Sequence, residues 1–226
     1  SQPTGIEWLT NFVVLPTIEG SASSGGVISV CGITGDVRGQ QYTTPDGDVL
    51  RPDYVIPDDP QTHESAKSGG QTDDRISIIN GDVLGLSGPG VKIAGVMPCT
   101  VIRKGDLADQ ALDREVSPEW HGERTQMIYG MPTAMEMWTN YQEIRAASMR
   151  NGGAGEEATE YYRENQELMD SGCEPSWPER HNDDELSAVQ NAMNLYFRDE
   201  ATFWAEYQNH PLEIQIDAST LTDDEI

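Results

Sequence analysis

Two adjacent carboxylates, Asp58 and Asp59, are the residues of this 226-residue chain best suited to chemistry. They follow the near-continuous apolar run 53–56, which has the length of a buried strand. In an open parallel sheet, ligands bind just beyond the carboxyl ends of the strands. One carboxylate at such an edge can hold Mg²⁺ beside nucleotide phosphates, while the next orients the attacking water. The alternative is a plain Asp-Asp-Pro turn, which is common in so acidic a chain.

Two further segments carry residues that could serve the same chemistry. Arg38 lies between glycines after the apolar run 27–31, where it could reach a γ-phosphate in its own subunit or in the next one. Thr100 follows the run 91–97 and could hydrogen-bond the γ-phosphate or the water that replaces it. Each has a structural alternative. Arg38 could be a turn arginine in a surface salt bridge, and Thr100 could cap a helix that begins near Asp106.

The elements that must position these residues change character near residue 105. Before it, short apolar runs bounded by Gly, Pro and Asp predict buried strands of a largely parallel sheet, at residues 12–15, 27–31, 53–56 and 91–97. Residues 64–86 allow a helix between the last two runs, which predicts a strand–helix–strand unit. Residues 44–48 read as a turn, the tip of a hairpin before Val49 and Leu50.

After residue 105 the apolar spacing becomes helical. Helices are predicted over residues 133–150, 156–170, 183–197 and 199–208. Tyr161, Tyr162, Leu168 and Met169 are expected on one face of the second of these. The Trp and Tyr residues of this lobe are interpreted as core rather than as a base-stacking platform. The sequence therefore predicts an α/β layer followed by a helical lobe.

The charge balance is strongly acidic, with 39 Asp and Glu against 14 Lys and Arg, a net charge of −25. Only three of the bases are lysines, a pattern that favours a folded protein adapted to high salt, where charge repulsion is screened within about 3 Å at 1 M. Such a chain is a poor generic nucleic-acid binder. No run approaches the ~20 apolar residues of a membrane span. Three widely spaced cysteines argue against a disulfide framework, and the four histidines lack metal-ligand spacing.

Taken in order, these segments resemble the large subunit of the terminases of tailed viruses, the motor that packages DNA. The resemblance runs from about Trp8 to Leu212. Five segments carry it: Gly32-x-x-Gly35-Asp36-x-Arg38-Gly39, Arg51-Pro52-Asp53-Tyr54-Val55-x-x-Asp58-Asp59-Pro60-Gln61-Thr62, Met97-Pro98-Cys99-Thr100-Val101-Ile102, Gly105-Asp106-Leu107-Ala108-Asp109, and Phe203-x-x-Glu206-Tyr207-Gln208-Asn209-x-Pro211.

The resemblance implies roles for four residues. Asp58 matches the Walker B acid that holds Mg²⁺, and Asp59 matches the catalytic carboxylate that orients water. Many relatives have Glu at the second position, so the shorter Asp59 would need to hold the water closer. Arg38 matches an arginine finger acting across a subunit boundary. Thr100 matches the motif that couples hydrolysis to DNA movement, and it also lies at the nucleotide.

The resemblance also implies an organisation. The family's ATPase is a P-loop fold of the ASCE type, with a helical lid and a following ribonuclease-H-like nuclease domain. Residues 1–105 would be the second half of the ATPase core, residues 106–211 the lid, and residues 212–226 a linker toward the nuclease. No Gly-x-x-x-x-Gly-Lys-Ser/Thr motif occurs in the chain, so the phosphate loop is expected before Ser1. The chain by itself is therefore expected to be inactive.

The expected cofactors are ATP and Mg²⁺. The expected partners are double-stranded viral DNA, the portal protein, the small terminase subunit and further copies in a ring on the portal, all in the host cytoplasm. Arg103, Lys104, Arg114 and Arg124 form a loose basic cluster near the lid. Two alternatives stay open: another ASCE ATPase such as a helicase-like translocase, or a non-enzymatic acidic interaction protein.

Overall fold

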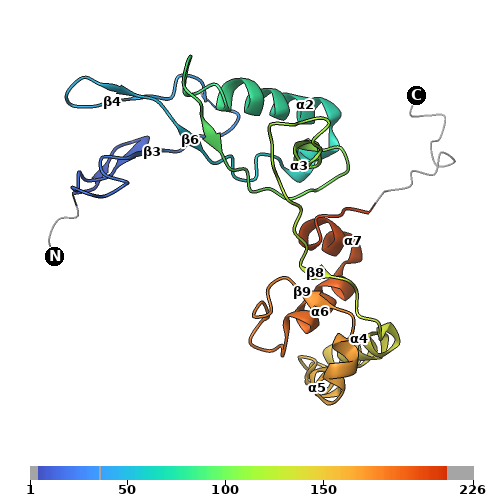
Figure 1. Cartoon of the computed structure of the whole chain (residues 1–226). Helices are drawn as coiled ribbons and strands as arrows, with labels where there is room; N and C mark the ends of the chain where they lie inside the picture. The colour runs from blue at the N-terminus through green and yellow to red at the C-terminus, as the bar shows by residue number, and fades with distance from the viewer. Residues whose placement is uncertain (1–4, 36, 213–226) are drawn as a thin grey trace, which may run out of the picture. The chain divides into compact units, whose positions relative to one another are not determined.

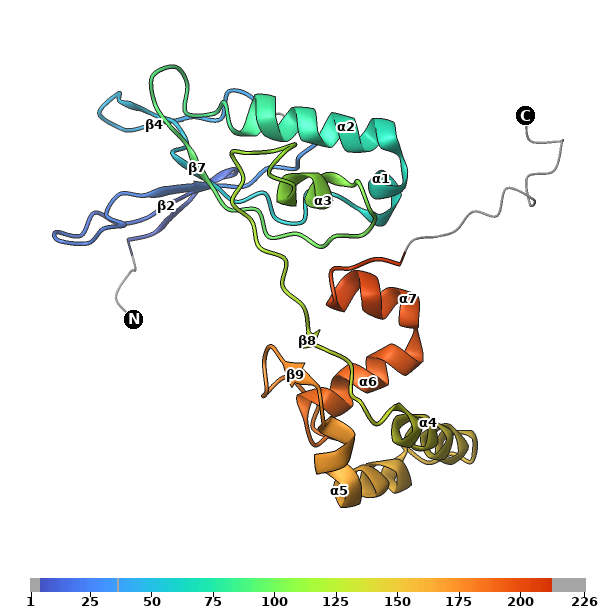
Figure 2. The same ribbon diagram turned by 45° about the vertical axis from the view of Figure 1, so that its right-hand side comes forward.

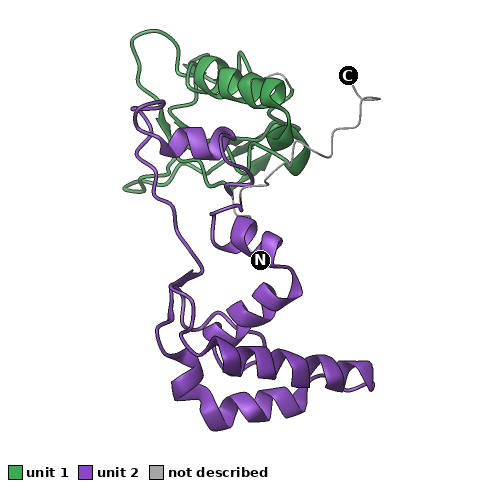
Figure 3. Ribbon diagram, turned by 90° about the vertical axis from the view of Figure 1, so that its right-hand side faces the viewer, with its two compact units in different colours: residues 1–99 green, residues 100–226 purple. Residues whose placement is uncertain are grey.

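The computed structural model describes residues 5–35 and 37–212, and Figure 1 labels the elements along the chain. Asp36 of the first motif and residues 213–226 of the predicted linker lie outside the described residues. The chain divides into two units, residues 1–99 and 100–226 (Figure 3). This boundary falls a few residues before position 105, where the hydrophobic pattern changes.

The first unit begins with a three-stranded antiparallel sheet of β1 (Glu7–Trp8), β2 (Phe12–Val14) and β3 (Val27–Ser29). The strands predicted at residues 12–15 and 27–31 are present, but the expectations of parallel pairing and burial are wrong. A parallel pair needs a crossover of a dozen or more residues, usually helical. The chain between β2 and β3 instead folds back through turns, with the Gly25 amide donating to the Pro16 carbonyl at 3.2 Å.

The predicted hairpin is confirmed. β4 (Tyr42–Thr43) pairs antiparallel with β5 (Val49–Leu50). The Thr44 hydroxyl accepts a hydrogen bond from the Asp48 amide at 3.0 Å, and Gly47 supplies the positive φ of 93° that the tip requires.

The predicted strand–helix–strand unit is also confirmed. β6 (Tyr54–Val55) pairs in parallel with β7 (Ala94–Gly95). The connection carries α1 (His63–Lys67), α2 (Gly69–Ser77) and the π-helical segment η1 (Ile78–Val83). The expected burial of the strands is wrong, because Tyr54 is 50% and Val96 53% exposed. Within the described residues only β6 and β7 pair in parallel, so the chain is mixed α/β with small sheets.

The second unit is mainly helical (Figure 2). Its elements are α3 (Leu107–Leu112), β8 (Ile128–Tyr129), α4 (Met135–Arg150), α5 (Glu156–Asp170), β9 (Glu174–Pro175), α6 (Ala188–Arg198), α7 (Glu200–Thr202) and the π-helical segment η2 (Phe203–Tyr207). β8 and β9 form an antiparallel pair. The four predicted helices are therefore present, although the third begins later than expected.

The late start of α6 has a local cause. Ser187 caps the helix, its hydroxyl accepting from the Gln190 amide at 3.1 Å. Ahead of the cap, the buried Glu185 carboxylate accepts from the Asn182 amide at 2.9 Å. It also accepts from the side chains of Asn191 and Asn194, at 2.7 and 2.8 Å. These bonds hold the preceding turn in a non-helical conformation.

Aromatic residues form the core of the second unit, as predicted. Trp138 is fully buried, with ring centroids 5.2 Å from those of both Tyr141 and Tyr162. Its indole nitrogen donates to the Met169 carbonyl at 2.8 Å. The placement of Leu168 on this face is wrong, since the residue is 63% exposed. Successive helical residues are about 100° apart, so a face that buries Met169 turns its neighbour toward solvent.

At the end of α5, burial raises the pKa of the Asp170 carboxyl, although hydrogen bonds from Tyr162 (2.7 Å) and Gln166 (3.4 Å) act to lower it. The folded protein therefore holds this proton more tightly than the unfolded chain. The group's contribution to stability should rise as the pH falls through the folded pKa toward the ordinary value of about 4. The Asp170→Asn side chain is neutral at every pH. The free energy of unfolding of this variant, relative to that of the wild type, should therefore be higher at pH 7 than at pH 4. Urea unfolding of both proteins at several pH values measures this, and identical pH profiles would contradict it.

Candidate active site

Asp58 and Asp59 lie just beyond the carboxyl end of β6. Main-chain pairing with the β7 segment continues past the strands: the Val96 amide donates to the Val55 carbonyl at 3.1 Å, and the Asp59 amide to the Pro98 carbonyl at 3.0 Å. The segments that follow the two parallel strands therefore leave from the same edge. This is the edge at which ligands of parallel sheets bind.

The backbone at Asp59 is left-handed, with φ of +42°. Among the described residues only Asn209 shares a positive φ without being glycine. Asp tolerates this conformation better than most residues, at a cost on the order of 1 kcal/mol. Both carboxylates are exposed, while Pro60 and Gln61, which follow, are buried. The two acids thus occupy a sharp turn whose far side is fixed in the core.

The turn leads directly into α1, and the helix start holds it in place. The Thr62 hydroxyl accepts from the Ser65 amide at 3.2 Å, and the Ser65 hydroxyl accepts from the Thr62 amide at 2.8 Å. This reciprocal capping box satisfies two amides that would otherwise lack partners. The plain-turn and active-site interpretations of Asp58 and Asp59 are compatible, because the turn itself presents both carboxylates to solvent.

Arg38 forms a surface ion pair. This is the arrangement that the sequence offered as the alternative to contact with a γ-phosphate. Its side chain is 82% exposed, and Nε donates to Oδ1 of Asp82 in η1 at 2.6 Å. Val37, immediately before it, is buried and anchors the loop. Within the described residues, the structure does not join Arg38 to Asp58 or Asp59 by a hydrogen bond or ion pair. An exposed pair of this kind contributes at most about 1 kcal/mol, so exchanging Asp82 for another anion would cost little.

Thr100 is the first residue of the second unit and is half-buried. The alternative in which it caps the following helix is wrong. Asp106 caps α3, with Oδ1 accepting from the Asp109 amide at 2.9 Å and Oδ2 from the Ile102 amide at 2.8 Å. Asp106 is 1% exposed, so its carboxylate also organises the chain ahead of the helix. An Asp just before the first apolar residues of a helix is a common N-cap, so the sequence already favoured Asp106 over Thr100 as the cap of α3.

The two carboxylates at the β6 edge suit Mg²⁺ that is bound together with phosphates and water. They do not by themselves make a metal site in which the protein supplies all of the ligands. Within residues 5–35 and 37–212 no group of three or more His, Cys, Asp or Glu could hold an ion. Mg²⁺ usually keeps several waters and binds one or two carboxylates together with substrate phosphates. Asp58, exposed at the strand end with Asp59 beside it, offers carboxylates of that kind.

One residue of the predicted basic cluster forms side-chain contacts within the second unit. Arg124 donates to the Asn209 carbonyl at 2.7 Å and to Asp109 at 2.5 Å, so its charge is used within the second unit. Arg103, Lys104 and Arg114 are exposed.

Cys31, Cys99 and Cys173 do not form disulfides with one another. Burial raises the pKa of the Cys173 thiol to about 11, so this thiol is protonated and unreactive near neutral pH.

Comparison with known proteins does not identify the chain. No family model, curated protein or solved structure matches it. Across the part of the chain that the structure describes, every helix is too short or too polar to span a bilayer.

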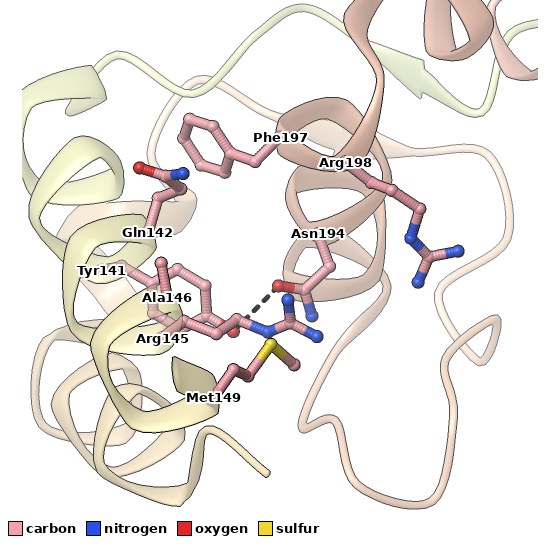
Figure 4. Close-up of a pocket in the computed structure, with 8 residues that line it drawn as sticks. All are labelled: Tyr141, Gln142, Arg145, Ala146, Met149, Asn194, Phe197 and Arg198. Carbon is pink, nitrogen blue, oxygen red and sulfur yellow. Dashed lines mark hydrogen bonds between the residues drawn. The ribbon is translucent and has the colours of Figure 1, made fainter. Parts of the chain in front are cut away.

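A groove between α4 and α6 was not predicted from the sequence (Figure 4). It has a volume of about 290 Å³, and eight residues line it: Tyr141, Gln142, Arg145, Ala146, Met149, Asn194, Phe197 and Arg198. Helical periodicity predicts which side of each helix is apolar. It does not predict how far apart two helices pack, and the packing creates this groove.

Proposed function

We propose that this chain is the Walker B, coupling and lid portion of the ATPase of a terminase-type motor that moves double-stranded DNA into procapsids. The observation that carries the proposal is the parallel pair β6–β7 joined by a helical crossover, with Asp58 and Asp59 in the turn after β6. An Asp pair at the carboxyl edge of parallel strands, followed at once by a capped helix, suits a site for nucleotide phosphates.

Four residues of the chain would have separate roles in ATP hydrolysis. Mg²⁺ would neutralise phosphate charge, and Asp58 would hold it. Asp59, fixed by its left-handed turn, would orient a water molecule for in-line attack. Arg38 would leave Asp82 and place its guanidinium against the γ-phosphate of a neighbouring subunit, an exchange that the weak surface pair permits. Thr100, next along the chain from the β7 segment, would pass the nucleotide state to the lid.

The proposal includes a phosphate-binding loop outside these 226 residues and a nuclease domain after them. It also includes the expected partners: the portal, the small terminase subunit and a ring of copies on viral DNA. The net charge of −25 limits phosphate contacts. The DNA grip would therefore depend on shape and hydrogen bonds more than on ion pairs.

ATP turnover by the full-length gene product in molar KCl tests the proposal. We expect Mg²⁺-dependent hydrolysis that excess EDTA abolishes, because the metal supplies most of the charge neutralisation in phosphoryl transfer. Cleavage of double-stranded DNA by the same protein is expected of a terminase and not of a helicase-like translocase. A full-length protein without Mg²⁺-dependent ATPase activity would contradict the proposal and favour a non-enzymatic interaction protein.

A further inference from the structure

The α4–α6 groove has a polar floor whose hydrogen-bonding groups are already paired. The Tyr141 hydroxyl donates to Asn194 Oδ1 at 3.0 Å and accepts from Gln190 Nε2 at 3.0 Å. The Asn194 amide nitrogen donates to the buried Glu185 carboxylate at 2.8 Å. Because these groups are paired and buried, the floor is fixed in place and offers a ligand few free donors.

Arg145 and Arg198 both line the groove, and within the described residues neither side chain forms an ion pair. Figure 4 shows the Arg145 side chain reaching from α4 toward Asn194 on α6, while Arg198 extends away from the other labelled residues. Within the described residues the Arg145 side chain has no hydrogen bond or ion pair. Two arginines elsewhere in this unit have acidic partners: Arg124 pairs with Asp109, and Arg163 with Glu160. Arg145 is partly buried, so its cation is partly removed from water without an anion to neutralise it.

The Arg145 side chain is also held in position from behind. A Cβ placed on Gly155, at the start of α5, would lie 3.0 Å from Arg145 Cγ. Gly155 is buried and has φ of +92°, so glycine is needed there both for the backbone and for the close approach of the arginine stem. The packing of the stem against Gly155 limits the rotamers of Arg145, which lowers the entropy lost when the guanidinium binds an anion.

Apart from the floor, the two arginines and Gln142, the groove is lined by apolar side chains. Ala146 and Met149 lie on α4 and Phe197 on α6, and Met149 is 43% exposed. Methionine and aromatic side chains adapt to apolar ligand groups, and both are enriched in protein interfaces. A cation such as Arg145 beside these walls suits an anionic group next to an apolar one. The phosphates of a nucleic acid fit less well, because a polyanion is repelled by a net charge of −25.

From these observations we infer that the α4–α6 groove is a docking site for a partner protein's peptide segment that carries a carboxylate beside an aliphatic side chain. The carboxylate pairs with the Arg145 guanidinium, and the aliphatic group packs between Met149 and Phe197. This site is separate from the nucleotide chemistry proposed for Asp58, so neither proposal depends on the other.

The test is a ¹H–¹⁵N NMR titration of the labelled chain with the probe peptide acetyl-Gly-Glu-Leu-Asp-Leu-Gly-amide. The same peptide with Gln and Asn in place of Glu and Asp is the neutral control. We expect the acidic peptide to shift amides of α4 and α6, and the neutral peptide to bind at least about 10-fold more weakly, as befits a charge-assisted hydrogen bond. Arg145→Gln should lower the affinity for the acidic peptide by a similar factor. The matched control Arg150→Gln removes the same charge from the same helix but outside the groove, and should change affinity less than about twofold.

Met149→Glu provides a second variant, since it places a carboxylate in the groove beside Arg145 and should block the peptide while leaving the arginine present. The spectra themselves report whether each variant folds. Equal binding of the acidic and neutral peptides, or equal effects of the Arg145 and Arg150 variants, would overturn the inference. Displacement of the peptide by a short DNA duplex in an Arg145-dependent way would also overturn it, by assigning the groove to phosphate.

Discussion

Asp58→Asn should lower ATP turnover by the full-length gene product by about two orders of magnitude or more. Asn keeps the size and one oxygen of the side chain but removes the charge that would hold Mg²⁺ at the end of β6. Losing one preorganised electrostatic contact to a phosphoryl-transfer centre costs on the order of 10²–10³ in rate. The residue is exposed, so the substitution should leave the unfolding free energy within about 0.5 kcal/mol of the wild-type value.

Asp53→Asn is the matched control, because it removes the same charge from an exposed aspartate on the amino side of the same strand. The main-chain bond from the Ala94 amide to the Asp53 carbonyl, 3.0 Å long, survives the change. We expect wild-type turnover from this variant. Asp59→Asn should also lose activity, since an amide orients water less effectively than a carboxylate. If Asp58→Asn and Asp53→Asn retained equal turnover, the Walker B assignment would be wrong.

Trp138→Ala should destabilise the helical unit by about 3–5 kcal/mol, the range for removing a buried Trp or Phe side chain. The indole is fully buried and contacts the rings of Tyr141 and Tyr162. Its removal also leaves the Met169 carbonyl without the indole hydrogen bond. Since whole domains are stable by only 5–15 kcal/mol, much of the unit's stability depends on this one side chain.

Trp177→Ala is the control, because this tryptophan is in the same unit but 61% exposed. It should change stability by less than about 0.5 kcal/mol. Urea unfolding at a fixed KCl concentration, followed by far-ultraviolet circular dichroism, compares the two variants. Comparable losses from both substitutions would show that the core does not centre on Trp138.

Local patterns predicted the helices better than the strand pairing. The spacing of Trp138 and Tyr141 identified α4, because a helix makes its hydrogen bonds within one segment and shows its buried face in the local sequence. The strands at residues 12–15 and 27–31 were recognised from composition, but their antiparallel pairing depended on how the intervening chain turned. Leu168 was misplaced because it and Met169 are successive residues about 100° apart on the helix, so both cannot lie on the buried face.

For the candidate site, the sequence identified the two acids and the strand that precedes them. It predicted neither the left-handed backbone at Asp59 nor the Arg38–Asp82 pair. The first arises where the chain turns sharply between β6 and a capped helix. The second joins residues 44 positions apart, which no local spacing encodes.

The sequence by itself determined the acidic net charge, the helical second half, the hairpin at residues 44–48 and the parallel strand–helix–strand unit around Asp58. These follow from charge, periodicity and turn chemistry, which act over a few neighbouring residues. Only the tertiary structure decided the antiparallel sheet of β1 to β3, the Glu185 network that delays α6, and the groove that leaves Arg145 unpaired. Each of these depends on contacts between segments far apart in the chain, where packing and hydrogen-bond satisfaction select one arrangement among several that the local sequence allows.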